Sequence, residues 1–144
     1  MYKKDIPNKI AFIGDYLPRK CGIATFTSDI FTSINNQYPK NNCFIIAVND
    51  TKDGYKYPKE VKFEIVEQEL ASYQRAADFI NFNNIEIVSL QHEFGIYGGN
   101  SGSHILALLR DLHVPVVTTF HTILDKPSHE QFVIMKEIIK LSVV

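Results

Sequence analysis

Short apolar runs alternate with amphipathic stretches along the whole chain. Compact apolar runs at 9–14 and 43–48 predict buried strands, and the alternating run at 61–65 predicts a half-exposed third strand. Two more apolar runs, at 85–90 and 114–120, predict a fourth and a fifth strand. Polar loops rich in glycine, proline and asparagine separate these runs.

Between the strands, apolar residues recur at steps of three and four, which is the spacing of one helix face. This spacing predicts helices over 24–37, 70–83, 105–112 and 128–140, the second of them closed by the pair Asn83 and Asn84. Strands that alternate with helices require right-handed crossovers and a sheet covered on both faces. We therefore expect an α/β fold with a doubly wound, mainly parallel, Rossmann-like sheet.

Composition narrows the classes of function. The 144 residues, 45% of them hydrophobic, fit one domain with a substantial core. Fifteen basic and sixteen acidic residues give a formal net charge of −1, so nucleic acid is an unexpected partner. The segment Leu141 to Val144 has the pattern of an opening strand, and this apolar ending suggests a fragment of a longer protein.

The chain carries no signal for a membrane or an oxidising compartment. No apolar run approaches the ~20 residues that span a bilayer, and no secretory apolar core follows Met1 to Pro7. Two cysteines, Cys21 and Cys43, form no Cys-x-x-Cys pair, so we expect neither a disulfide framework nor a zinc site. These features predict a cytoplasmic protein.

Unusual residues gather in three loops, 15–25, 91–102 and 118–122, which follow the first, fourth and fifth predicted strands. The carboxyl ends of parallel strands meet at one edge of a sheet, where ligands of such folds bind. In the first loop, Arg19, Lys20 and Gly22 precede a helix whose backbone N–H groups are suited to an anion. The alternative is a glycine turn with two solvated cations, and the Gly-x-Gly-x-x-Gly fingerprint is absent.

The second and third loops each bring a histidine to this edge. His92 and Glu93 stand before a run of glycines, and Ser101 or Ser103 is expected to cap the next helix. His121 ends the fifth strand, within reach of a substrate phosphate or hydroxyl. A lone histidine is more often structural than catalytic, but two on neighbouring strand ends favour a site. The remaining histidines lack metal-ligand spacing and are interpreted as surface or capping residues: His104, His113 and His129.

Three motifs, at 18–26, 91–99 and 119–122, resemble those of the family 4 (group 1) retaining glycosyltransferases, and the match runs across nearly the whole chain. The resemblance implies a GT-B architecture, in which two Rossmann-like domains face a cleft. Residues 1–144 would be the N-terminal, acceptor-side domain, and the C-terminal, donor-binding domain would be absent from this chain. The fragment alone would then be inactive, whereas the full-length protein would be a hexosyltransferase.

The resemblance also implies roles for residues at the three loops. His121 matches the catalytic strand-end histidine that contacts the transferred sugar, and Gly22 lies in the loop that approaches the donor diphosphate. His92 and Glu93 would line the acceptor side. The donor would be a GDP- or UDP-linked sugar, for which mannose is our hypothesis, used with a saccharide or other hydroxyl acceptor and without metal or cofactor. The expected substrate-binding residues are Arg19, Lys20, Gly22, His92, Glu93, Gly98 and Gly99.

Three other functions stay open. Asp50 follows the second strand, where an acidic side chain can bind ribose hydroxyls, so a Rossmann-type nucleotide-binding module is one alternative. An exposed loop at 94–97 would suit a non-catalytic interaction domain. A hydrolase that uses His92, Glu93 and His121 lacks both a Gly-x-Ser-x-Gly elbow and a metal set.

Overall fold

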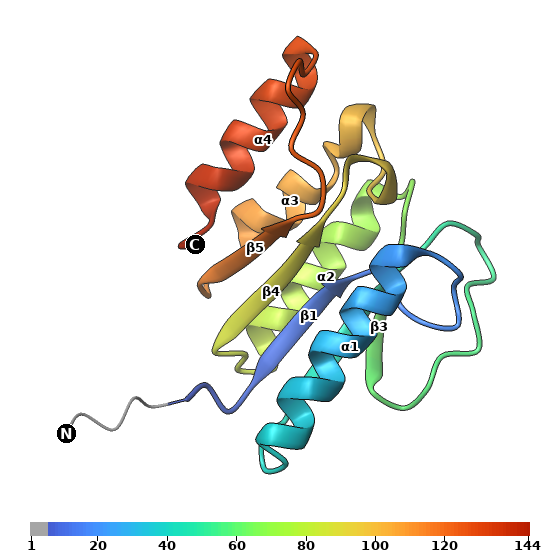
Figure 1. Cartoon of the computed structure of the whole chain (residues 1–144), viewed down its shortest axis with the longest axis vertical. Helices are drawn as coiled ribbons and strands as arrows, with labels where there is room; N and C mark the ends of the chain where they lie inside the picture. Colours follow the sequence, from blue (N-terminus) through green and yellow to red (C-terminus); the bar gives the residue numbers. More distant parts are fainter. Residues whose placement is uncertain (1–5) are drawn as a thin grey trace.

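A computed structural model describes residues 6–144 as strands and helices wound around one parallel sheet (Figure 1). The sheet has five strands in the order β3-β2-β1-β4-β5, and each neighbouring pair is parallel. The fold expectation is confirmed. Residues 1–5, which carry part of the argument against a secretory leader, lie outside the described residues. The strands are β1 (Ile10–Gly14), β2 (Phe44–Asn49), β3 (Val61–Val66), β4 (Ile87–His92) and β5 (Val116–Phe120).

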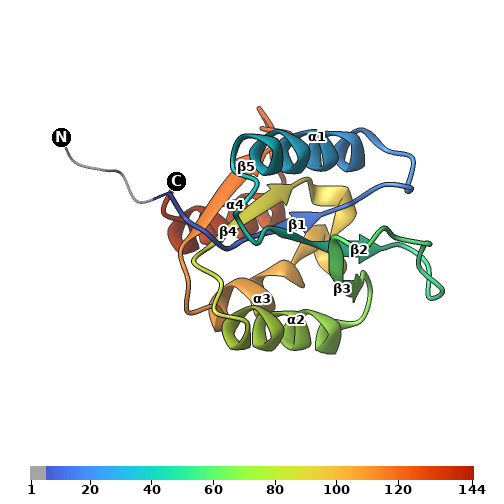
Figure 2. The same ribbon diagram turned by 90° about the horizontal axis from the view of Figure 1, so that it is seen from below.

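The helices cover both faces of the sheet. Figure 2 shows α1 on one side of it and α2 with α3 on the other, while α4 packs against α3 and the edge strand β5. None of the helices in residues 6–144 is long and apolar enough to cross a bilayer. The helices are α1 (Gly22–Gln37), α2 (Leu70–Phe82), α3 (Ile105–Asp111) and α4 (His129–Leu141), with short 3-10 helices η1 (Phe94–Ile96) and η2 (Asn100–Gly102).

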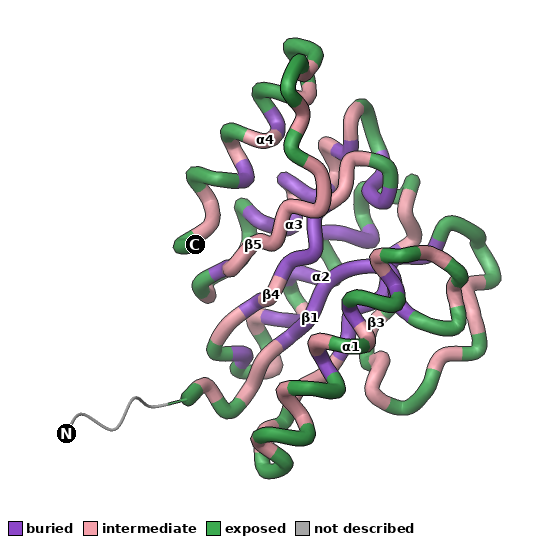
Figure 3. Tube along the Cα trace, in the orientation of Figure 1, coloured by how far each residue is buried: buried purple, intermediate pink, exposed green. Residues whose placement is uncertain are grey.

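Two hydrophobic clusters hold the layers together. The smaller one lies between α1 and the sheet, where the ring of Phe12 meets that of Phe31 edge-on at 5.8 Å. The larger one fills the other face, where Tyr73, Leu90 and Leu108 are among its fully buried side chains. The most buried strands are the central three, β2, β1 and β4, and Figure 3 shows buried positions along β1 and β4. The loops at the carboxyl ends of β1 and β4 therefore project from the buried centre of the sheet.

Strand ends differ from the sequence expectation by about two residues. The fourth strand was expected at 85–90, but β4 runs from Ile87 to His92 because its last two residues pair with Thr119 and Phe120 of β5. His92 is therefore a strand residue and not a loop residue. The fifth strand begins at Val116 and not at 114. Asn83 closes α2 as predicted, followed by Asn84 with a φ of 54°.

Two expectations for segment ends are wrong. No serine side chain caps α3: its N-cap is His104, which makes no side-chain capping bond. The strand expected over 141–144 is not formed, because Leu141 ends α4. The residues that follow instead lie beside β5, where the Val143 N–H donates to the Val116 carbonyl at 2.8 Å.

Candidate functional site

The three loops predicted to carry chemistry meet at one edge of the sheet. His121 joins the second and third loops, because its Nε2 lies 3.0 Å from Gln91 Oε1 and its backbone N–H donates to the His92 carbonyl at 2.9 Å. A second link is the hydroxyl of Thr122, which donates to Glu93 Oε2. The edge of Phe26 in α1 packs on the His121 ring at 4.7 Å between ring centroids, which adds the helix that follows the first loop.

This edge lies where the order of the sheet reverses. Going outward from β1, the sheet continues to β2 on one side and to β4 on the other. The chain leaving β1 enters α1 on one face, whereas the chain leaving β4 continues to α3 on the opposite face (Figure 2). Two connections that diverge to opposite faces leave a crevice between them, which is the usual ligand position in open parallel sheets.

The start of α1 offers free backbone donors. The Cys21 thiol is the N-cap and accepts a hydrogen bond from the Ala24 N–H at 3.3 Å. The N–H groups of Gly22 and Ile23 precede any intrahelical acceptor and have no partner among the described residues. A Cβ built on Gly22 would meet nothing within 4 Å. Two unpaired N–H groups at the positive end of a helix dipole are suited to an anion.

The two neighbouring cations of the first loop have different environments. Arg19 is only 14% exposed, and its guanidinium binds Asp15 at 2.8 Å and the Val48 carbonyl at 3.3 Å, with Asp50 at 3.7 Å. Burial raises the pKa of Asp15 to about 6, although Arg19 acts in the opposite direction. Desolvation thus outweighs the ion pair here. Lys20 is exposed and makes no ion pair within residues 6–144, so it is the cation with freedom to meet a ligand.

Asp50, the residue behind the nucleotide-module alternative, is already engaged. One of its carboxylate oxygens accepts a hydrogen bond from the Tyr55 hydroxyl at 2.8 Å, and the other faces Arg19. A carboxylate that binds ribose has to offer its oxygens to two hydroxyl groups. This arrangement makes Asp50 part of the contact between the first loop and the loop after β2.

His92 is enclosed by aromatic rings. Its side chain is buried beside Phe94, Tyr97 and Phe120, with ring centroids 4.9, 6.1 and 5.2 Å away, and neither ring nitrogen has a partner in the described residues. Burial lowers the pKa of His92 to about 4, while the neighbouring Glu93 opposes the shift. His92 is therefore uncharged at neutral pH. The group that it extends to the edge is its carbonyl, which holds the His121 backbone.

Two glycines of the second loop, Gly98 and Gly99, serve packing. A Cβ on Gly98 would lie 1.9 Å from the Glu67 carbonyl oxygen, and the Gly98 N–H donates to the Tyr73 hydroxyl at 3.0 Å. Gly99 has a φ of 77° and donates to Gln68 at 3.3 Å. The expected exposed segment at 94–97 is also wrong in part, because Ile96 and Tyr97 are buried. This loop folds down onto the chain between β3 and α2.

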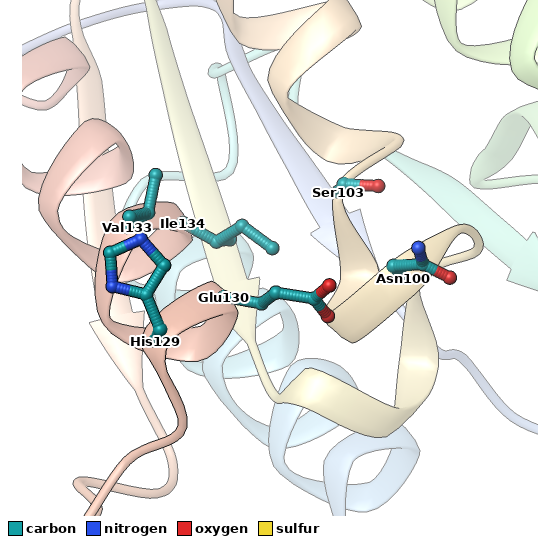
Figure 4. A pocket seen from close by; sticks show the side chains of 6 residues that line it. All are labelled: Asn100, Ser103, His129, Glu130, Val133 and Ile134. Atoms are coloured by element: carbon teal, nitrogen blue, oxygen red, sulfur yellow. The ribbon is translucent and has the colours of Figure 1, made fainter.

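A separate hollow lies between α4 and η2. Its volume is about 280 Å³, and in Figure 4 the Glu130 side chain extends from α4 toward Asn100 and Ser103. None of the site residues predicted from the sequence lines it, within residues 6–144. The Ser128–Gln131 capping box, readable as a Ser-x-x-Gln pattern, sets the start of α4 and hence this wall.

Sequence reasoning missed the side chains that contact His121 and Glu93. Gln91, Phe26 and Thr122 belong to the motifs singled out above, yet none was identified as a site residue. For Gln91 a signal existed, because an amide side chain at the end of an apolar strand is expected to bind a specific partner. In the sequence, Phe26 is one member of the apolar stripe of a helix. Only the structure shows that its ring packs against His121 and not in the core.

The class of protein that the fold and the edge define is an open parallel α/β domain in which α1 begins with unpaired backbone N–H groups, beside a histidine–amide pair. Nowhere in the described residues do three or more His, Cys, Asp or Glu residues gather as a set that could hold a metal ion. Comparison of the chain with protein-family models, curated proteins and solved structures finds no match. The evidence on function is therefore the residues and their geometry.

Proposed function

We propose that this chain is the acceptor-side domain of a retaining glycosyltransferase that moves a sugar from a nucleotide-sugar donor to a hydroxyl acceptor. The observation that carries the proposal is that Phe26 of α1, the helix that begins at Gly22, packs against His121 of the third loop. Phe26 lies four residues, or about 6 Å of helix rise, beyond Gly22. One ligand can thus touch the helix start with a charged group and His121 with a neutral one.

The helix start supports a role toward the donor diphosphate. When a glycosyl group leaves its nucleotide, a bond forms between the acceptor oxygen and the anomeric carbon as the bond to the diphosphate breaks. Negative charge then builds up on the diphosphate, and fixed N–H donors stabilise that charge without reorganising. The N–H groups of Gly22 and Ile23 have no partner within residues 6–144 and supply such donors, and Lys20 adds an exposed cation.

His121 supports a role toward the sugar. Burial lowers the pKa of His121, with Glu93 acting in the opposite direction, so the ring is neutral near pH 7. A neutral imidazole offers one donor and one acceptor, which suits a hydroxyl group better than a phosphate. The ring is half-buried and fixed by Gln91 and Phe26, as expected for a group that positions a reacting sugar.

The competing functions have less support from the same contacts. A nucleotide-binding module needs a free carboxylate after β2, but Asp50 binds Arg19 and Tyr55. An interaction surface at 94–97 needs exposed apolar side chains, but Ile96 is 6% and Tyr97 3% exposed. The sugar, which we propose to be mannose, and the GDP or UDP carrier rest on the resemblance of the loop motifs alone.

The test is release of nucleoside diphosphate from a panel of GDP- and UDP-sugars, with acceptors varied. The protein to assay is the polypeptide that joins residues 1–144 to a donor-binding domain, with the 144-residue chain beside it. We expect turnover only when both domains are present, and a loss of roughly 100-fold for His121→Ala. His113→Ala, an exposed histidine at the far end of β5, is the control and should change nothing. Absence of release by either protein, with every donor and acceptor, would contradict the proposal.

A further inference from the structure

Gln91 is a buried polar residue whose side chain has only two partners. It is 0% exposed and stands one residue before the end of β4, opposite Thr119 of β5. Its amide oxygen lies 3.0 Å from His121 Nε2, and its amide nitrogen donates to Ser89 Oγ at 3.2 Å. In the structure the amide oxygen faces His121 and the amide nitrogen faces Ser89.

The fold makes room for this amide at the point where the sheet order reverses. A Cβ on Gly14, the last residue of β1, would lie 3.0 Å from Gln91 Cβ and 3.2 Å from the Thr27 hydroxyl. The missing side chain at Gly14 therefore lets Gln91 lie between β1 and α1. The Gln91 side chain lies at the base of the proposed ligand edge and is buried.

The direction of the Gln91–His121 bond determines the tautomer of the histidine. With the amide nitrogen turned to Ser89, the atom that faces His121 is a carbonyl oxygen, which only accepts. Nε2 must then carry the proton, and Nδ1 of the neutral ring keeps its lone pair. Nδ1 has no partner within residues 6–144 and is not among the enclosed atoms, so solvent or a ligand reaches it.

We propose that Gln91 is a positioning residue that holds His121 as the Nε2–H tautomer, so that Nδ1 accepts a hydrogen bond from a ligand hydroxyl. Phosphate oxygens at neutral pH offer acceptors and would face the lone pair unfavourably. A sugar hydroxyl offers the donor that the ring requires. The identity of the ligand rests on the proposed function, whereas the tautomer and the role of Gln91 do not.

Other groups around the ring are compatible with this assignment. Glu93 is the nearby carboxylate and is tied to the Thr122 hydroxyl and to the Phe94 N–H, so it does not compete for the ring nitrogens. His92 lies behind its own aromatic neighbours and contacts His121 through its carbonyl. Phe26 packs edge-on against the ring and offers no acceptor. Among the described residues, Gln91 is thus the side chain that sets the protonated nitrogen.

The first experiment reads the side-chain nitrogens of ¹⁵N-histidine-labelled chain by long-range ¹H–¹⁵N correlation across a pH titration. We expect the Nε2–H tautomer for His121 in the unmodified chain, and in Gln91→Glu a pKa of His121 raised by about 1 to 3 units, because a carboxylate would face Nε2. Gln91→Leu should release the tautomer preference without adding charge. Gln74→Glu, at an exposed position on α2, is the matched control and should leave His121 unchanged.

Either of two results overturns the role of Gln91: an Nδ1–H tautomer in the unmodified chain, or an unchanged pKa of His121 in Gln91→Glu. The first needs no variant, so it holds even where a change at buried Gln91 prevents folding. The ligand is tested separately, on the polypeptide that joins residues 1–144 to a donor-binding domain, by adding GDP-mannose or inorganic phosphate at millimolar concentration. GDP-mannose should shift Nδ1 and phosphate should not, and a shift of Nδ1 by phosphate alone would overturn the hydroxyl assignment. Failure of GDP-mannose to bind would count against the proposed function and leave the tautomer result standing.

Discussion

Two loops at the same edge of the sheet carry the glycines that motif reasoning assigned to ligand binding, and they use glycine in opposite ways. Gly22 opens α1 and faces empty space, with unpaired N–H groups beside it. Gly98 is buried, and the space that a Cβ would need is filled by the Glu67 carbonyl. In one loop the missing side chain leaves room for a ligand, whereas in the other it leaves room for the protein itself.

The comparison extends to the charges and the histidines. Arg19 is committed to a buried carboxylate while Lys20 beside it is free. Likewise, His92 is enclosed by aromatic rings, whereas His121 lies at the ligand edge of the sheet. Residues of one motif and one chemical type therefore divide into a supporting set and a contacting set. Substitutions that separate the two sets are the sharpest way to challenge this division.

The largest effect is expected for Gly98→Ala. A Cβ 1.9 Å from a backbone oxygen cannot be accommodated by a side-chain movement, so the second loop must lift from the turn before α2. We expect a loss of about 3 kcal/mol or more in the free energy of unfolding, measured by urea denaturation, or failure to fold. A Gly98→Ala protein as stable as the parent would show that this glycine is not a packing residue.

The next effect separates the two cations. Arg19→Ala would leave Asp15 buried without its ion-pair partner, at a cost of about 3 kcal/mol in the same measurement. Lys20→Ala removes an exposed charge and should change stability by less than about 0.5 kcal/mol. Equal losses for the two variants would contradict the assignment of Arg19 to the supporting set.

A pH-dependent effect is expected at His92. The pKa of His92 is about 4 in the folded chain and 6.5 for an unperturbed histidine, as in the unfolded chain, so the folded state binds fewer protons. Its contribution to stability is present above pH 6.5 and is lost as the pH falls toward 4. His92→Phe keeps an aromatic ring among the same neighbours. Its free energy of unfolding should rise by about 2 kcal/mol relative to that of the parent as the pH falls from 7.5 to 5.

The parent alone would not reveal this dependence. The raised pKa of Asp15 acts in the opposite direction, because its protonated form is favoured by folding and that benefit is lost as the pH rises through about 6. The two groups partly cancel between pH 4 and 6.5, and only the difference between variant and parent isolates His92. His113→Phe, at an exposed position, should show no such difference. A pH-independent difference for His92→Phe would mean that the ring is not enclosed.

A small change in stability, in the direction of a gain, is expected for Gly22→Ala. The added methyl group meets nothing within 4 Å, and alanine reduces the freedom of the unfolded chain. We expect a change between zero and a gain of about 1 kcal/mol, measured by thermal unfolding. A clear loss would indicate that the space in front of Gly22 is needed by the chain itself.

The division between the two loops was only partly readable from the sequence. Alternating runs and helical stripes indicated the parallel α/β fold, because a five-stranded order with crossovers leaves few other solutions. Strand ends were harder: polar Gln91 and His92 looked like loop residues, but pairing with β5 buries them. The roles within each motif were not readable, since they depend on contacts between distant segments, such as Gly98 with Glu67. The three loops at one edge were predicted correctly from the strand ends.

The central claim is that the start of α1 and His121 form the ligand-contacting set. Its most direct test is a titration with GDP- and UDP-sugars of ¹⁵N-labelled residues 1–144 joined to a donor-binding domain, followed through backbone amide shifts, with Gly22→Ala and Gly95→Ala in parallel. Gly95 also has no atom within 4 Å of its built Cβ, so it is the matched control. We predict shifts at Gly22, Ile23 and His121 that Gly22→Ala weakens about tenfold and Gly95→Ala leaves intact. Shifts confined to the Gly98 loop or to the hollow beside α4, or no shifts at millimolar ligand, would contradict the account.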